Sequence, residues 1–121
     1  MKKAKFKNNI KIEIADKQHI SYIDTINQTI EDASNERGTG IAKRTYEYLK
    51  SKIEDGKAII ATEDGKFAGF CYIETWGHGR FVANSGLIVT PDYRGVGLAK
   101  DIKRKAFTQR YVLSSKTITT F

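Results

Sequence analysis

The segment Gly86–Ile102 reads GLIVTPDYRGVGLAKDI, and its order of residue types indicates a strand, a tight turn and a helix. The apolar stretch Phe81–Val89 predicts a buried strand, which Pro91 terminates. Two glycines, Gly95 and Gly97, follow just before an amphipathic pattern begins. Glycines let the backbone turn with converging N–H groups, and a helix start adds unpaired N–H groups at the positive end of the helix dipole. The segment therefore predicts a cradle for a phosphate group.

The spacing of these glycines excludes two familiar nucleotide-binding loops. The GxxxxGK[ST] pattern is absent, and a complete GxGxxG pattern would need glycine where the chain has Lys100. A near copy of the turn occurs at residues 37–43 (RGTGIAK), but it follows a polar helix end instead of an apolar strand. Only the second copy therefore has the strand-to-helix setting that a phosphate site needs.

Working outward from this turn, the pattern of apolar residues predicts the order β-α-α-β-β-β-α-β. Asp16 and Thr45 are the expected N-caps of the first two helices, and Gly56 is expected to end the second in the left-handed conformation. The third helix should bury a stripe that begins at Leu98. The predicted strands are 10–14, 57–62, 67–76, 81–89 and 117–121, with turns at 63–66 and 77–80, and the first two helices are 16–34 and 45–55.

Composition narrows the class of protein further. The 121 residues suit a single domain (1–121), and 40% hydrophobic with 29% charged residues excludes a disordered chain. No apolar run approaches the ~20 residues of a membrane helix. One cysteine and two histidines argue against a disulfide framework and against a metal site, so we expect a cytoplasmic protein without a metal or a membrane partner. The net charge of +7 raises nucleic-acid binding as an alternative, but no such motif is present.

The glycine segment resembles the acyl-CoA motif of the GNAT superfamily of N-acetyltransferases, [QR]-x-x-G-x-[GA]. Arg94, Gly97 and Ala99 occupy the defining positions, and the predicted order of elements is similar to the family's across essentially the whole chain. The resemblance implies an α+β fold of the three-layer α/β type, with a mixed, mainly antiparallel sheet flanked by helices. It also implies that the last strand, helix and strand of the family are missing after residue 121. Either the chain is a fragment or shortened product, or a second subunit, as in a homodimer, completes the sheet.

The resemblance implies transfer of an acetyl group from acetyl-CoA to a small primary amine such as an amino acid. Backbone N–H groups near Val96 would bind the CoA pyrophosphate, and the backbone around Ile88 would pair with the pantetheine arm. The basic side chains of Arg94, Lys100, Lys103 and Arg104 are candidates to neutralise phosphates, although Lys103 and Arg104 are better explained as part of a solvated helix face. The residues expected at the acyl-CoA site are Leu87, Ile88, Val89, Arg94, Gly95, Val96, Gly97, Leu98, Ala99 and Lys100.

The catalytic groups are less defined. Glu74 is the nearest candidate base, although strand alternation also allows it simply to face outward, and no tyrosine can be assigned as the proton donor. Cys71 is expected to be a small buried apolar residue. Between the first two helices, Arg37, Lys43 and Arg44 could bind an acidic acceptor or could be solvated. A truncated, inactive CoA-binding module is the alternative function.

Overall fold

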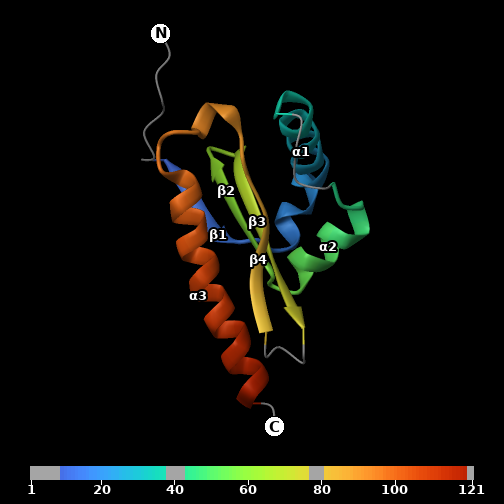
Figure 1. The fold of residues 1–121 in the computed structure, drawn as a ribbon, viewed down its shortest axis with the longest axis vertical. Helices are drawn as coiled ribbons and strands as arrows, with labels where there is room; N and C mark the ends of the chain where they lie inside the picture. Colours follow the sequence, from blue (N-terminus) through green and yellow to red (C-terminus); the bar gives the residue numbers. More distant parts are fainter. Residues whose placement is uncertain (1–8, 38–42, 77–80, 120–121) are drawn as a thin grey trace.

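The computed structural model describes residues 9–37, 43–76 and 81–119, and its centre is one antiparallel sheet in the order β1-β2-β3-β4 (Figure 1). Helices cover both faces of this sheet, with α1 and α2 on one face and α3 on the other. The strands are β1 (Ile10–Ile14), β2 (Ala58–Glu63), β3 (Lys66–Trp76) and β4 (Phe81–Val89); the helices are α1 (Ile23–Arg37), α2 (Tyr46–Glu54) and α3 (Leu98–Thr119), with 3₁₀ turns η1 (Lys17–Tyr22) and η2 (Pro91–Tyr93). This is the predicted α+β fold.

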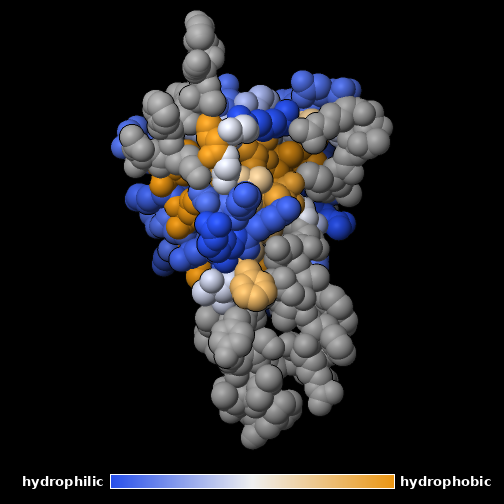
Figure 2. Space-filling model, turned by 60° about the vertical axis from the view of Figure 1, so that its left-hand side comes forward, coloured by the Kyte–Doolittle hydropathy of each residue, from blue (hydrophilic) through white to orange (hydrophobic). Residues whose placement is uncertain are grey.

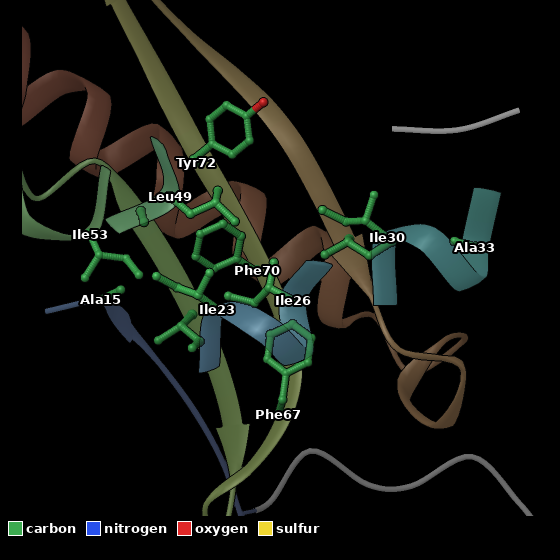
Figure 3. Packing of buried hydrophobic residues seen from close by; sticks show 13 residues of the cluster. Ala15, Ile23, Ile26, Ile30, Ala33, Leu49, Ile53, Phe67, Phe70 and Tyr72 are labelled. Carbon is green, nitrogen blue, oxygen red and sulfur yellow. The ribbon is translucent and has the colours of Figure 1, made fainter. Parts of the chain in front are cut away.

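Two apolar clusters hold the layers together, and strand alternation divides residues between them. On β3, Phe70 and Tyr72 pack toward α1 and α2, whereas Cys71 and Ile73 pack toward α3. The first cluster includes the isoleucine stripe of α1 and the apolar side of α2 (Figure 3). Because both faces of the central strands are covered, β2 and β3 read as nearly continuous apolar runs instead of alternating ones.

Several predicted turns and caps are confirmed. The Thr45 side chain accepts a hydrogen bond from the Tyr48 N–H at the start of α2, and Gly56 follows that helix with φ +73°. Asp64 and Gly65 both have positive φ values, 50° and 84°, in the hairpin between β2 and β3. The predicted turn at 77–80 lies outside the described residues. The confirmed caps and the confirmed hairpin could be predicted from sequence because the conformation of each depends on a few adjacent residues.

The structure corrects the sequence expectation in two places. The helix expected after Asp16 begins as the 3₁₀ turn η1. Asp16 is its N-cap as predicted: the Asp16 side chain accepts the Gln18 N–H at 3.1 Å, and His19 Nδ1 accepts the Asp16 N–H at 3.0 Å. The strand predicted at 117–121 is wrong for residues 117–119, which continue α3 to Thr119, and residues 120–121 lie outside the described range. The β-branched residues there favour a strand locally, but extending an existing helix adds a hydrogen bond per residue without a strand partner.

Tyr93, the last residue of η2, is completely buried, and its hydroxyl donates to a Glu63 carboxylate oxygen. Burial, followed by this hydrogen bond, raises the pKa of Tyr93 to about 12. Because this pKa exceeds the ordinary value near 10, the buried phenol stabilises the fold fully below pH 10, and the contribution is lost as pH rises through 12.

We therefore expect the free energy of unfolding to fall between pH 10 and 12 more steeply in the wild type than in Tyr93→Phe. A difference of two pKa units corresponds to at most about 2.7 kcal/mol. Urea denaturation at a series of pH values measures this slope, and Tyr46→Phe, at an exposed position, is the control. Identical slopes in the wild type and Tyr93→Phe would contradict the expectation.

Candidate acyl-CoA and acceptor site

The turn between β4 and α3 presents a row of unused backbone donors. Gly95 and Gly97 have φ values of +86° and +82°, a region in which glycine is strongly favoured. None of the N–H groups of residues 95–100 donates a backbone hydrogen bond to another described residue, whereas the Asp101 N–H donates to the Gly97 carbonyl at 3.1 Å. A Cβ placed on Gly95 would meet no atom within 4 Å, so the turn is open on that side. These donors, at the positive end of the 22-residue α3, form a cradle that fits a phosphate group.

Cationic side chains surround this cradle on the first turns of α3. Lys100, Lys103 and Arg104 are exposed, and Figure 2 shows a group of hydrophilic residues in the middle of one face, with apolar residues beside and above it. Arg104 lies 3.1 Å from the Asp101 carboxylate, so its charge is partly balanced within the helix. The local field at the turn therefore favours an anion.

Arg94 differs from these cations because part of its guanidinium already contacts other groups of the protein. Its Nε donates to the Val89 carbonyl at 3.2 Å, and its Nη1 lies 3.9 Å from a Glu36 carboxylate oxygen on α1. Arg94 therefore links the end of β4 with the end of α1. Its predicted contact with a CoA phosphate would have to use the remaining guanidinium donors.

Strand β4 leads into this cradle with one edge free in the described sheet. Among the described strands it pairs only with β3, where Ile88 lies opposite Phe70 and Val89 opposite Gly69. The backbone of residues 87–89 can therefore pair on its outer edge with an extended ligand, as strands do in β-augmentation. The predicted residues 87–89 therefore form the end of β4, and the predicted residues 94–100 form the turn and the start of α3 that follow it after η2.

A bulge at Gly86 interrupts β4 just before this edge, and sequence reasoning missed it. The register shifts between Phe70 and Tyr72, and Gly86 has φ +66°. A Cβ on Gly86 would lie only 2.2 Å from Cε2 of the Tyr72 ring, so the ring packs directly on the glycine. A glycine inside an otherwise apolar strand was the available signal for this close approach.

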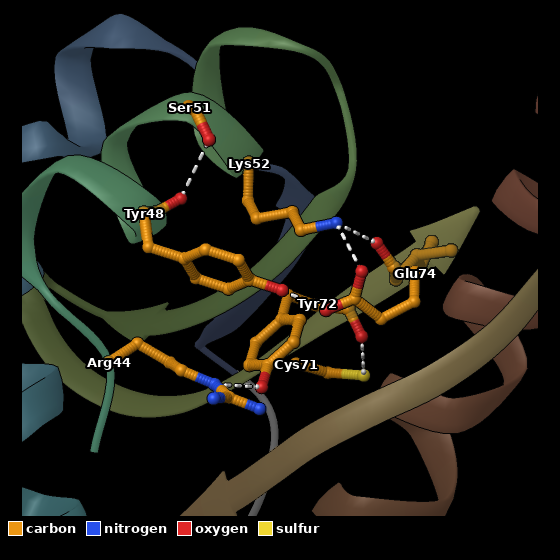
Figure 4. A network of polar contacts seen from close by, with 8 residues as sticks. Arg44, Tyr48, Ser51, Lys52, Cys71, Tyr72 and Glu74 are labelled. Atoms are coloured by element: carbon orange, nitrogen blue, oxygen red, sulfur yellow. Dashed lines mark hydrogen bonds and ion pairs between the residues drawn. The ribbon is translucent and has the colours of Figure 1, made fainter. Parts of the chain in front are cut away.

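Glu74 lies on the α2 side of β3, the same side as Tyr72, in a network of polar contacts (Figure 4). One carboxylate oxygen accepts a hydrogen bond from the Lys52 ammonium at 3.0 Å, and the other accepts a hydrogen bond from the Tyr48 hydroxyl. The Glu74 side chain is 33% exposed, so it is neither an outward-facing strand residue nor a fully buried one. Burial, and next the nearby charge of Lys57, lowers the pKa of Lys52.

Arg44 extends this network toward solvent. Its Nε donates to the Tyr72 hydroxyl at 2.9 Å, and its guanidinium carbon lies 5.3 Å from the centre of the Tyr48 ring. Asn27 on α1 donates to the Arg44 carbonyl at 2.9 Å, which holds the chain just before α2. Arg44 and Glu74 therefore place opposite charges on either side of the tyrosine pair Tyr48 and Tyr72.

The other predicted acceptor-binding cations are not part of this network in the described residues. Lys43 forms an ion pair with Glu31 on α1 at 3.1 Å, and both side chains are about half exposed. Arg37 ends α1, and its side chain lies outside the described part of the structure. Cys71 is fully buried on the α3 side, its Sγ 3.7 Å from the Tyr72 carbonyl, as expected for an apolar core position.

Two further features concern residues 9–37, 43–76 and 81–119. Within these ranges, no group of three or more histidine, cysteine, aspartate or glutamate side chains is arranged to hold a metal ion. None of the described helices combines the length and apolar character needed to cross a bilayer.

The fold, the glycine turn and the open β4 edge together define an acyltransferase-like domain. Residues 27–109, more than half of the chain, match the family model described as "Acetyltransferase (GNAT) family". The chain therefore belongs to the GNAT acetyltransferase family, as its resemblance predicts. No curated protein sequence matches the chain significantly.

Solved structures of similar fold come from several acetyltransferases. N-acetylglutamate synthase from Neisseria gonorrhoeae, complexed with coenzyme A and N-acetyl-glutamate, has a TM-score of 0.69 at 19% identity, over 86% of this chain and 23% of that one. A diaminobutyrate acetyltransferase from Paenibacillus lautus, in complex with L-2,4-diaminobutyric acid and coenzyme A, has a TM-score of 0.67 at 13% identity, over 83% of this chain and 57% of that one. A putative acetyltransferase from Salmonella typhimurium with acetyl-CoA has a TM-score of 0.66 at 18% identity, over 88% of this chain and 65% of that one. The chain thus spans between about a quarter and two thirds of these relatives.

Proposed function

We propose that this protein transfers an acetyl group from acetyl-CoA to a small primary amine. The observation that carries the proposal is the row of N–H groups at residues 95–100, for which no backbone acceptor of good geometry lies among the described residues, next to the β4 edge at residues 87–89 that no described strand pairs with. The row suits a pyrophosphate and the strand edge suits an extended amide-containing arm, and acyl-CoA carries both groups in that order. The family membership and the CoA bound in related folds support the same donor.

The reaction converts R–NH₃⁺ and acetyl-CoA into the acetamide, free CoA thiol and one proton. A base must accept a proton from the ammonium before its nitrogen can attack the acyl carbon and the C–S bond can break. Glu74 is the candidate base, since it is partly exposed and lies on the face covered by α2. In this proposal Glu74 also contributes negative charge that attracts the cationic acceptor.

Arg44 supports a more specific acceptor, an amine that also carries a carboxylate, such as an amino acid. Its Nε is used on Tyr72, which leaves the Nη donors to bind a carboxylate in a forked arrangement. Glu74 lies on the other side of the tyrosine pair, so the charges would match both ends of a zwitterion. The amino-acid ligands of two related folds support the same class.

Replacing Arg44 with alanine should raise KM for glutamate about 10- to 100-fold, because a charge-assisted hydrogen bond contributes about 1.5–3 kcal/mol. The KM for spermidine, which has no carboxylate, should change little or fall. Steady-state kinetics with both amines measures the difference, and Lys50→Ala removes an exposed cation of α2 as the matched control. A preference of the wild type for spermidine, or glutamate kinetics unaffected by Arg44→Ala, would contradict the assignment.

The proposal as a whole is tested by release of free CoA thiol across a panel of amines, next to calorimetric titration with acetyl-CoA. Thiol release that depends on the amine supports acetyl transfer. Tight binding without release supports the alternative of an inactive CoA-binding module, and no binding contradicts both functions. A cytoplasmic location and a homodimer are part of the same proposal, and gel filtration with light scattering tests the dimer.

A further inference from the structure

The side chain of Lys52, on α2, is directed into the protein instead of into solvent. The residue is only 8% exposed, and its Nζ donates to the Ile73 carbonyl at 2.9 Å and to Glu74 Oε1 at 3.0 Å. Its ammonium also lies 5.5 Å from the centre of the Tyr48 ring. The side chain is therefore fixed by contacts with both β3 and α2.

Stability alone does not account for this arrangement. Removing an ammonium from water costs several kcal/mol, and apolar residues of similar size often stabilise a protein as well as a buried ion pair does. Burial lowers the pKa of Lys52, so the removal of its ammonium from water has a cost. The contacts of Lys52 point to a second role, because its ammonium fixes one oxygen of the Glu74 carboxylate.

The carboxylate of Glu74 is held at both oxygens. Lys52 contacts Oε1, and the Tyr48 hydroxyl donates to Oε2. Each carboxylate oxygen can accept more than one hydrogen bond, so lone pairs remain for a third donor. The carboxylate thus has a defined orientation and still has the capacity to accept a proton.

We propose that Lys52 is a positioning residue that orients the Glu74 carboxylate toward the ammonium of the acceptor. This inference rests on the proposed acetyl transfer. The proton moves from the acceptor ammonium to Glu74, which leaves the nitrogen lone pair free to attack, and Lys52 keeps its own protons throughout. Lys52 does not touch the substrate in this proposal and acts only through Glu74.

The described groups that can influence this proton transfer come from three elements. Lys52 and Tyr48 face Glu74 from α2, Arg44 faces it from the segment before α2, and Tyr72 lies on the same side of β3. Arg44 is exposed and therefore screened by water, whereas the Lys52 contact is direct and largely dry. Lys52 should consequently have the largest influence on the orientation of the Glu74 carboxylate.

The test compares Lys52→Met, Lys52→Arg and the control Lys50→Met, which removes an exposed lysine of the same helix that pairs with Glu54. Thiol release is measured at saturating acetyl-CoA over a range of amine concentrations, next to calorimetric titration with acetyl-CoA. In Lys52→Met, kcat should fall about 10-fold while the affinity for acetyl-CoA stays at the wild-type value, because a misdirected carboxylate slows proton transfer without changing the cofactor site. Lys52→Arg, which retains the charge and the hydrogen-bond donors, should keep most of the wild-type kcat, and Lys50→Met should leave kcat unchanged.

Carbon-13 NMR of the Glu74 carboxyl group gives a readout without turnover. The chemical shift of this signal at pH 7 should change in Lys52→Met and stay at the wild-type value in Lys50→Met. An unchanged signal in Lys52→Met, or an active wild type whose kcat Lys52→Met does not alter, would overturn the Lys52 proposal alone. Inactivity of Lys52→Arg would overturn it in favour of Lys52 as the base itself. A wild type that binds acetyl-CoA but never releases thiol would instead contradict the proposed function, and this role with it.

Discussion

Replacing Gly86 with alanine will destabilise the protein by about 3 kcal/mol or more, the largest effect that we expect from a single added methyl group. The φ of +66° disfavours any side chain, and the new Cβ would lie 2.2 Å from Cε2 and 2.9 Å from Cζ of Tyr72. Tyr72 cannot move away cheaply, because it is 2% exposed and its hydroxyl is bonded to Arg44. Urea denaturation of the two proteins measures the loss.

Gly65→Ala separates backbone strain from overpacking in this experiment. Gly65 has φ +84°, yet a Cβ there would meet no atom within 4 Å. The control should therefore lose only about 1 kcal/mol, the cost of the left-handed conformation. Equal losses at both positions would show that Tyr72 does not pack on Gly86 as described.

Gly97→Val should weaken acetyl-CoA binding about 100-fold or more while the fold remains intact. At φ +82°, valine is strained, and it would turn the following N–H groups away from their common direction just before α3 begins. The predicted pyrophosphate contact depends on several of these donors at once, so the loss should be larger than that of one hydrogen bond. Isothermal titration calorimetry with acetyl-CoA measures the affinity.

The matched control for this variant is Gly65→Val, which introduces the same side chain at a left-handed glycine in the hairpin between β2 and β3. It should lose a similar amount of stability but bind acetyl-CoA like the wild type. Circular dichroism checks that both variants are folded. If Gly97→Val retains wild-type affinity, the assignment of the pyrophosphate to this turn is wrong.

The sequence alone was sufficient for the features that depend on neighbouring residues. The glycine turn, the caps at Thr45 and Gly56 and the hairpin at Asp64 and Gly65 are each set by backbone preferences over a few positions. The buried stripes of the helices likewise follow from short-range spacing. The positions at residues 87–89 and 94–100 could be proposed as an acyl-CoA site for the same reason, because strand, turn and helix are contiguous there.

Only the tertiary structure decided which distant side chains meet. Glu74 and Lys52 are 22 positions apart, and Arg44 and Tyr72 are 28 apart, so no local pattern could pair them. Packing of α2 on β3 brings both pairs together, and it also excludes Lys43, which turns to Glu31 instead. The end of α3 shows the same limit, since residues with strand preference remain helical where the preceding helix offers their backbone hydrogen-bond partners and none of the four described strands pairs with them.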